Sequence, residues 1–502
     1  MRSKLVLTAA LIGSQAAMAG SDTWFTPLTE SATVVGPNDL EELTSPWVTP
    51  ADISQKNIIS LREVEDTVLS PLQSIIRVNA GTSSSMFDML AYDPTGEYLF
   101  IPHETPFGAG VTRYSVYDNA SEVIFQGDQG GADNDWSNDF GAFDPCRFTP
   151  NGTLFLAEEW AGMGRVLEVL NPFDPVEEIQ TRVLDSIANV SHEGINFSKK
   201  FDDTIYFVDE NHSGSIYKFV MATPGDYTVG QTFVLSVDAF TGNSAENYST
   251  DDVRTGEATW IPLTDEVGNT LPGLTDPFVD DLNNPGDRPG RTAADEAGGT
   301  PYGRPEDMAI SRLKNGREVL YFTATSEATV YSVEILEKRG GWYWNRGWRW
   351  RGKTASDKAI VRTFVNDDSP KNLGFDGTTA TLNSPDNLAL DALGNIYVIE
   401  DAPNGSATGG DVWFARDTNN DGVAESLDHF MSIRVDGSEA TGMIWNPEIP
   451  TEFAICVQHP DSTNLSNVPD GLGDSVWLFN VTPIENEKFV KSLNKAKPVF
   501  GE

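Results

Sequence analysis

The sequence is poor in cysteine and in positive charge. Cys146 and Cys456 are the only cysteines in 502 residues, which excludes a disulfide-rich scaffold and leaves room for one disulfide at most. Lysine and arginine number 34 against 75 aspartate and glutamate residues, which gives a formal net charge of −41. Such a chain repels nucleic acid and anionic lipid surfaces and attracts divalent cations. An acidic surface that keeps the protein soluble in salt explains much of this charge equally well.

Long hydrophobic runs are also missing. No stretch approaches the roughly 18 to 20 apolar residues that a membrane-spanning helix needs. The N-terminus instead carries Arg2 and Lys4, an apolar run over residues 5–13, and small residues that end at Ala19. This pattern predicts a secretory signal peptide over residues 1–19. We therefore expect an exported protein, periplasmic or extracellular, without a transmembrane segment.

A short unit recurs six times along the chain. Each copy has an apolar strand, a turn with Gly, Asp, Asn or Pro, and a second strand that ends in polar residues. The copies begin at Asp88, Asp144, Glu193, Glu306, Asp386 and Thr441. The repeat predicts an all-β fold, most simply a six-bladed β-propeller formed by residues 20–502 as one domain. A β-sandwich or two separate β domains is the alternative.

The spacing of the copies is irregular. The longest interval separates the third copy from the fourth and contains an acidic stretch rich in Gly and Pro, residues 240–303. This stretch is interpreted as an insertion loop.

Alignment of the copies by their turns places acidic residues at equivalent positions. The first strand begins with a carboxylate in five of the six copies. The second strand ends at Glu104, Glu159, Glu210, Thr325, Asp401 and the pair Gln458-His459. Because neighbouring antiparallel strands start and stop at the same edge of a blade, both sets should face one mouth of the central channel. Carboxylates crowded in this way either protonate or bind cations, and their oxygens suit calcium, manganese or ferric iron better than zinc.

Arg304 lies two residues before Glu306, at the edge of the same mouth. A guanidinium beside acidic metal ligands can hold a phosphate through two hydrogen bonds while negative charge grows in the transition state. A plain ion pair between Arg304 and Glu306 is an equally good interpretation. The residues alone therefore leave a substrate-binding role for Arg304 open.

A separate acidic segment, DTNNDGVAESLD, begins at Asp417. Asp417, Asn419, Asp421 and Asp428 have the spacing of a calcium loop, although Asp replaces the usual final Glu and no helix precedes the loop. We predict a peripheral calcium site, with an ordinary polar turn as the alternative.

Residues 339–353 are basic and aromatic in an otherwise acidic chain. The alternation of arginine with aromatic residues predicts a hairpin that stacks on rings or contacts anionic surfaces, or one that cation–π contacts brace against a blade. The sequence assigns this segment no function.

Taken together, the motifs resemble the PhoX-type bacterial alkaline phosphatases, which are exported propellers that hydrolyse phosphomonoesters with an iron–calcium cluster. The resemblance extends over most of the mature chain. It rests on the ordered motifs TPNGTLFLAEEW, SHEGINF, IYFVDENHSGSIYKF, GRPEDMAI, SPDNLAL, and EATGMIW with VQHP.

The resemblance implies roles for individual residues. Metal ligands are implied at Glu159 or its neighbour Glu158, and at Glu193, Glu210 and Glu306, with Asp386 and Glu439 at further polar positions of the family. Arg304 is implied to hold the phosphate, and Asn138 to contact the substrate.

One departure from the family concerns iron. The family has an iron-binding cysteine where this chain has Asp144, and Cys146, two residues later, is expected on the other face of the strand. Asp144 can bind iron or calcium, but the loss of the thiolate leaves the mixed cluster in question.

The sequence thus predicts an exported phosphomonoesterase with small phosphorylated substrates, calcium as cofactor and iron as a second candidate, and no nucleic-acid partner. A phosphodiesterase or a calcium-dependent lactonase is an alternative, because propellers support several hydrolytic reactions. A non-catalytic binding propeller stabilised by calcium is the other alternative.

Overall fold

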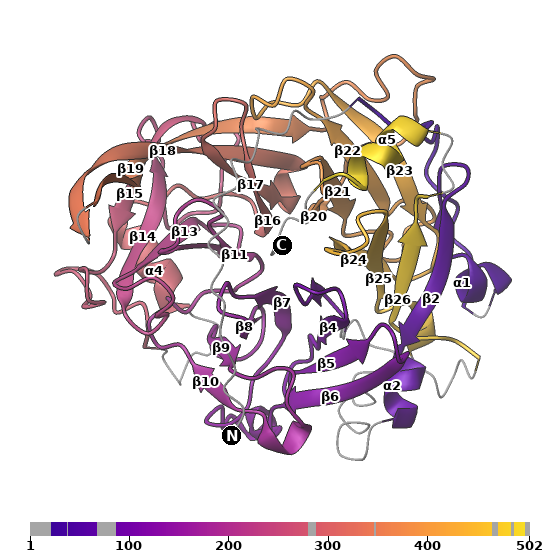
Figure 1. The fold of residues 1–502 in the computed structure, drawn as a ribbon, viewed down its shortest axis with the longest axis horizontal. Helices are drawn as coiled ribbons and strands as arrows, with labels where there is room; N and C mark the ends of the chain where they lie inside the picture. Colours follow the sequence, from indigo (N-terminus) through magenta and orange to yellow (C-terminus); the bar gives the residue numbers. More distant parts are fainter. Residues whose placement is uncertain are drawn as a thin grey trace.

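The computed structural model describes residues 22–37, 39–67, 87–279, 288–345, 348–463, 470–482 and 486–496, without the side chains of residues 65–67 and 338–356. The predicted signal peptide lies outside these residues. Where it is described, the chain is almost entirely β-structure, and its sheets surround a central axis (Figure 1). The predicted all-β propeller is confirmed.

The first two repeats each form one antiparallel sheet of four strands in sequence order. The strands of the first sheet are β3 (Ala91–Tyr92), β4 (Tyr98–Pro102), β5 (Gly110–Ser115) and β6 (Ala120–Gln126). Those of the second sheet are β7 (Phe143–Phe148), β8 (Leu154–Glu158), β9 (Val166–Val169) and β10 (Thr181–Val183).

The third and fourth repeats share one sheet of nine strands. One half contains β11 (Ile195–Phe197), β12 (Thr204–Val208), β13 (Ile216–Met221), β14 (Gly230–Val237) and β15 (Gly256–Pro262). The other half contains β16 (Pro305–Arg312), β17 (Glu318–Ala324), β18 (Thr329–Asn345) and β19 (Trp348–Asn366). Because β15 pairs with β19, the six predicted blades appear as five hydrogen-bonded sheets.

N-terminal strands complete the sheets of the last two repeats. The fifth repeat contributes β20 (Pro385–Leu390), β21 (Ile396–Glu400), β22 (Asp411–Arg416) and β23 (Ser426–Ile433), which β1 (Trp47–Val48) joins. The sixth contributes β24 (Glu439–Trp445), β25 (Glu452–Gln458) and β26 (Ser475–Asn480), which β2 (Ser54–Ser60) joins. The pairing of β2 with β26 closes the ring with strands from opposite ends of the chain.

Helices are short and lie between or outside the sheets. They are α1 (Leu40–Thr44), α2 (Leu61–Thr67), α4 (Pro289–Ala297), α5 (Glu487–Leu493) and the 3₁₀ turns η1 (Gly130–Asp133), η2 (Val176–Glu178), η3 (Thr325–Glu327) and η4 (Asp461–Thr463). Among the described residues, no helix has the length and apolar character that crossing a membrane requires.

The interval from residue 240 to 303 is more than a loop. It contains β15, which extends the third sheet, and α4, which packs Ala293 and Ala294 against that sheet's apolar residues. The prediction of an insertion loop is therefore wrong for these two elements. The apolar residues of β15 and α4 form short patterns, and the surrounding Gly, Pro and acidic residues make these patterns hard to recognise in the sequence.

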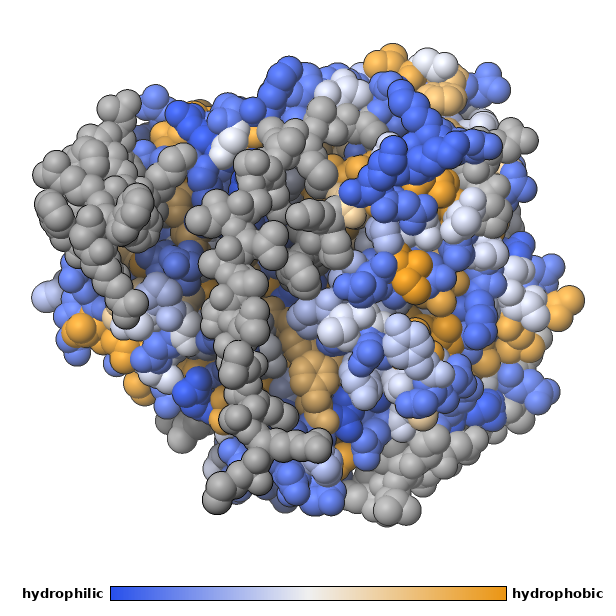
Figure 2. All heavy atoms as spheres, in the orientation of Figure 1, coloured by the Kyte–Doolittle hydropathy of each residue, from blue (hydrophilic) through white to orange (hydrophobic). Residues whose placement is uncertain are grey.

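The core lies between neighbouring sheets, where large aromatic side chains such as Trp260, Trp413 and Trp477 are fully buried. On the face seen in Figure 2, hydrophilic residues predominate among the described residues and apolar ones lie in scattered groups. In Figure 1, β7, β11, β16, β20 and β24, which are the first strands of five repeats, lie nearest the axis. The residues at their starts are therefore placed around the centre of the ring.

Candidate metal centre

A β-bulge marks the acidic position in three of the inner strands. The register of β7 with β8, of β16 with β17 and of β20 with β21 shifts by one residue at this point. Each bulge contains the acid of its repeat, namely Asp144, Glu306 and Asp386. A bulge bends the strand locally and changes the direction of a side chain, which frees these acids from the regular alternation of the strand.

A repeated backbone hydrogen bond ties the start of each inner strand to the end of the next strand. The amide of a residue one or two positions after the second strand donates to the carbonyl two residues before the acid. The pairs are Glu159 N to Ala142 O at 2.9 Å, Glu210 N to Ser191 O at 2.8 Å, Thr325 N to Arg304 O at 3.1 Å, and Asp401 N to Ser384 O at 2.9 Å. The two predicted sets of polar residues are therefore held together at one edge of four repeats.

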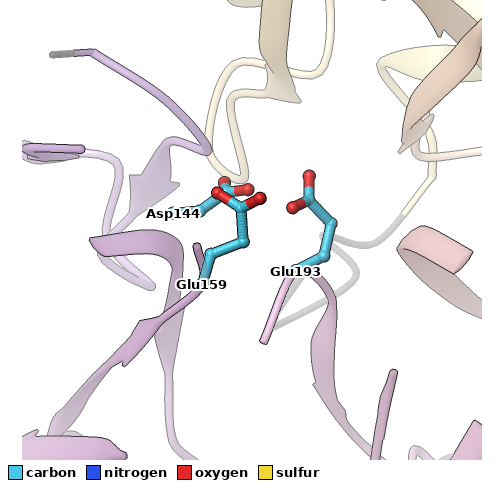
Figure 3. Close-up of side chains that lie close together, drawn as sticks. All are labelled: Asp144, Glu159 and Glu193. Carbon is cyan, nitrogen blue, oxygen red and sulfur yellow. The ribbon is translucent and has the colours of Figure 1, made fainter. Parts of the chain in front are cut away.

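Two groups of three carboxylates converge near the axis, and both contain Glu193. Asp144, Glu159 and Glu193 form the first group, and in Figure 3 their carboxylates point into the same small space. Glu193, Glu306 and Asp386 form the second. In each group the potential ligand oxygens lie within 4.8 Å of one another. Five residues that the sequence predicted as ligands are thus brought together.

Burial and mutual repulsion raise the pKa of every acid in these two groups well above its usual range. For Glu193, burial is the largest cause, followed by the charges of Asp144 and Glu159 and then those of the second group. Asp144, Glu159, Glu306 and Asp386 behave in the same way, with burial as the largest cause. The carboxylates therefore carry their full negative charge only if a counter-charge is bound among them.

The donor set fits a hard divalent or trivalent cation. Asp144 Oδ1, Glu306 Oε1 and Asp386 Oδ1 are buried and accept no hydrogen bond from the described residues. A buried oxygen without a donor costs about 1 to 3 kcal/mol, and more when it is charged. All five residues offer carboxylate oxygens, which calcium prefers, whereas zinc prefers histidine and cysteine.

Cys146 does not join this site. Its thiol is free and fully buried in a hydrophobic cluster with Phe100 and Phe143, and Cys456 is likewise free and buried. Residues two apart on a regular strand share a face, so the bulge after Phe143 is what separates Asp144 from Cys146. The expected placement of Cys146 on the other side is correct, for this reason.

Arg304 stands beside the second group. Its Nε donates to the Glu210 carboxylate, and its Nη2 lies 3.3 Å from Glu306 Oε1. The charge of Glu306 is the largest of the influences that raise the pKa of Arg304, so the guanidinium stays protonated. The Arg304 side chain is 35% exposed, against 2% for Glu306. The predicted ion pair therefore exists, and the guanidinium remains accessible from the mouth as well.

Glu210 belongs to neither group of three, although the resemblance implied that it binds metal. Its carboxylate is engaged by Arg304 at the rim. Glu210 thereby fixes the orientation of the guanidinium.

The structure separates Glu158 from Glu159. Glu158 points away from the axis, where its carboxylate accepts hydrogen bonds from the Arg165 guanidinium and from the backbone amides of Gly141 and Met163. Both of its oxygens thus accept hydrogen bonds from residues in or next to the second sheet. Glu158 is a structural residue, and Glu159 is the member of the pair that faces the other acids.

Glutamine substitutions should distinguish the two neighbours. Glu158→Gln breaks a buried ion pair and should lower the free energy of unfolding by about 3 kcal/mol or more while bound metal is retained. Glu159→Gln should lower the metal content and leave the Arg165 pairing intact. Urea unfolding and metal analysis of both proteins provide the comparison, and equal metal loss in both would contradict this assignment.

Glu439 and Asn138 lie outside the two groups. Glu439 begins β24 and pairs with His459, whose Nε2 lies 3.4 Å from Glu439 Oε2. Burial lowers the pKa of His459, but the Glu439 carboxylate outweighs it and raises this pKa to about 10. Asn138 is exposed on the loop between β6 and β7. Neither residue is a member of the two groups, although the charge of Glu439 contributes, after burial and Asp401, to the raised pKa of Asp386.

Asp88 and Thr441, the first and last members of the predicted ring, close the other side of the axis. Thr441 Oγ1 donates to Asp88, and Gln458 Nε2 donates both to Asp88, at 2.8 Å, and to Glu104, at 2.7 Å. Both oxygens of Asp88 therefore have hydrogen-bond partners, whereas Asp144 Oδ1 has none among the described residues. This part of the ring is held by protein donors.

The predicted calcium loop is not assembled as the spacing suggested. Asp428 lies in β23, where Arg416 and the hydroxyls of Ser426 and Thr23 surround its carboxylate. Asp417 instead accepts hydrogen bonds from the amides of Asp421 and Gly422, and Asn419 donates to Glu425. The final ligand position is lost because the chain enters a strand before residue 428, so an ordinary polar turn describes this segment better.

Residues 339–345 and 348–353 fall in the antiparallel pair β18 and β19, as predicted for a hairpin. Their side chains lie outside those described, so the alternatives for this segment remain predictions.

Two arginines that the sequence analysis missed support the acidic loops. Arg288 is 2% exposed and donates to the carbonyls of Glu159, at 2.5 Å, and Gly162, at 2.9 Å. Arg291 binds Asp209 through two hydrogen bonds of 2.6 Å and also contacts Ser191, two residues before Glu193. Both come from the start of α4. Their one signal in the sequence is a pair of basic residues in an acidic insertion.

Comparisons with known proteins agree with this architecture. The family model described as alkaline phosphatase PhoX matches residues 110–461. Among solved structures, the chain is similar to Pseudomonas fluorescens PhoX in complex with vanadate, a transition-state analogue, with 16% identity and a TM-score of 0.58 over 92% of this chain and 98% of that chain. None of the curated proteins gives a significant sequence match.

A more distant structural similarity is to a catalytically inactive virginiamycin B lyase from Staphylococcus aureus with quinupristin. Its identity is 9% and its TM-score 0.37, over 86% of this chain and 100% of that chain.

Proposed function

Because this chain belongs to the PhoX alkaline phosphatase family, we propose that it is an exported, metal-dependent enzyme that hydrolyses phosphomonoesters at the acidic mouth of its propeller. The observation that carries the proposal is the pair of carboxylate groups that share Glu193, with the accessible Arg304 beside them. Export is supported by the signal-peptide pattern at residues 1–19.

The acids would hold calcium, with iron as a second candidate. Asp144 and Glu159 would bind on one side of Glu193, and Glu306 and Asp386 on the other. When bound, the cations would polarise the phosphoryl oxygens and offset the negative charge that the acids present to an anionic substrate. Asp144 takes the place of a thiolate, so the site offers oxygen ligands alone, which favours calcium.

Arg304 would bind the phosphate. Two N–H groups of a guanidinium match two oxygens of a phosphoryl group, and this contact strengthens as charge accumulates on them in the transition state. Glu210 would hold the guanidinium in place through Nε and Glu306 through Nη2, while the Arg304 side chain as a whole remains 35% exposed.

Chelation tests the proposal most directly. Incubation with EGTA and removal of the chelator should reduce hydrolysis of p-nitrophenyl phosphate about 100-fold or more, because both the metal charge and the orientation of the acids are lost. Added calcium should restore turnover, with ferric iron as the comparison. Full activity in protein shown by elemental analysis to be free of metal would refute the proposal.

Parallel substrates separate the proposal from its alternatives. Bis-p-nitrophenyl phosphate turned over faster than the monoester would indicate a phosphodiesterase, and a hydrolysed lactone would indicate a lactonase. Calcium binding without any turnover would indicate a non-catalytic propeller.

A further inference from the structure

Trp160 directly follows Glu159 and is 46% exposed. The other tryptophans with described side chains are buried or half-buried. A single exposed apolar residue is common on protein surfaces, so exposure alone carries no meaning. The position of Trp160, one residue after a member of the first carboxylate group, is what sets it apart.

The indole is fixed across the mouth. Its Nε1 donates to a carboxylate oxygen of Glu104, and the other oxygen of Glu104 accepts from Gln458 Nε2 at 2.7 Å. The charge of Glu104 is the largest cause after burial of the raised pKa of Glu159, so Glu104 lies close to the first group. Trp160 therefore spans from the second sheet to an acid of the first sheet, at the edge of the site.

The backbone on both sides of the indole is fixed as well. Buried Arg288 donates to the carbonyl before Trp160, that of Glu159, and to the carbonyl of Gly162 two residues after it. Gly162 has φ 72°, a left-handed conformation that glycine adopts without strain. An aromatic ring held in this way is ordered before a ligand arrives, which lowers the entropic cost of binding.

Trp160 and Arg304 flank the same acids. Arg304 Nη2 lies 3.3 Å from Glu306 of the second group, Trp160 directly follows Glu159 of the first group, and Glu193 belongs to both groups. A phosphate held by Arg304 and the acids would therefore leave the ester group of the substrate near the rim that Trp160 forms.

We propose that Trp160 is a specificity-determining residue whose exposed indole face stacks on the leaving group, so that the site prefers phosphomonoesters with a planar ring, aryl phosphates and nucleoside monophosphates, over glycerol phosphates. The inference rests on the proposed function, because it takes the phosphate to lie between Arg304 and the carboxylate groups. Every base or aryl ring presents a flat face, so stacking selects the class of leaving group and not one compound.

The test compares Trp160→Leu and Trp160→Phe with the wild type on AMP, p-nitrophenyl phosphate and glycerol 2-phosphate. Loss of one stacking contact should raise KM for AMP and p-nitrophenyl phosphate about tenfold in Trp160→Leu, with kcat and the glycerol 2-phosphate KM nearly unchanged. Trp160→Phe keeps a ring but loses the N–H to Glu104, and should retain most of the preference.

Equal losses on all three substrates would show that Trp160 only supports the site, and unchanged constants would show that it does nothing there; either result overturns the inference. If the wild type hydrolyses none of the three, the proposed function fails instead. Calorimetric binding of AMP and glycerol 2-phosphate to the calcium-loaded proteins then decides the stacking question, and AMP binding that Trp160→Leu does not weaken overturns the inference independently.

Discussion

Arg304→Ala is expected to lower kcat/KM for p-nitrophenyl phosphate by roughly 10²- to 10³-fold, the loss found when a group that stabilises transition-state charge is removed. The guanidinium is protonated, oriented by Glu210 and 35% exposed at the mouth. The N–H groups that neither Glu210 nor Glu306 engages are therefore available for phosphoryl oxygens. Most of the loss should appear in kcat, because the contact strengthens as the phosphoryl group gains charge.

Two further variants separate binding from structure. Arg304→Lys keeps the charge but not the two-pronged geometry, and should recover only part of the activity. Arg317→Ala removes an arginine of the same sheet that pairs with Glu334 at 2.6 Å and is 45% exposed, and should leave kcat/KM unchanged. If Arg304→Ala retains wild-type kcat/KM while its metal content is normal, the ion pair with Glu306 is structural and the phosphate-binding role is wrong.

The convergence of the acids could be predicted from the sequence because the repeat is local. Each copy carries its own strand, turn and strand, so aligning the turns places Asp144, Glu306 and Asp386 at one edge without knowledge of the whole ring. Ring closure by β2 and β26 then fixes the distance between the copies. Five of the predicted acids converge for this reason.

The choice between adjacent acids could not be predicted, because it depends on bulges and distant partners. Glu158 is oriented by Arg165, seven residues later on the neighbouring strand, and Asp428 by Arg416 across a strand pair. Strand alternation gives two faces but does not say which face receives a guanidinium. A one-residue bulge also breaks the regular alternation of the strand, as it does between Asp144 and Cys146.

The roles of Arg288 and Arg291 could not be predicted from the sequence for a different reason. Arg288 lies 129 residues from Glu159, in the interval that reads as a loop. The proximity of α4 to the mouth results from the packing of the third sheet, which no local pattern encodes. Contacts between the site and a segment distant in the sequence are therefore the feature of this fold that is hardest to predict from the sequence.

Glu193→Gln is expected to have the second large effect, a loss of bound metal on both sides of the site and a fall in kcat of more than about 100-fold. Even the mutation of a group that only orients metal ligands lowers metal affinity or activity by about 10- to 100-fold. Glu193 is the residue that both carboxylate groups share, so an amide in its place removes one charged oxygen donor from each. Glu439→Gln makes the same chemical change at an acid that belongs to neither group, although its charge acts on Asp386, and should lower metal content and kcat far less than Glu193→Gln.

Unfolding of the same proteins provides a readout independent of activity. Without metal, burial disfavours the ionised form of Glu193 most, followed by repulsion from the charges of Asp144, Glu159, Glu306 and Asp386, which is why its pKa is raised. Glu193→Gln removes this repulsion, so the metal-free variant should unfold at a higher temperature than the metal-free wild type. Added calcium should raise the unfolding temperature of the wild type and of Glu439→Gln, but much less that of Glu193→Gln. A calcium response in Glu193→Gln equal to that of the wild type would mean that the cation is bound elsewhere, because a ligand shared by both groups cannot be replaced without weakening both.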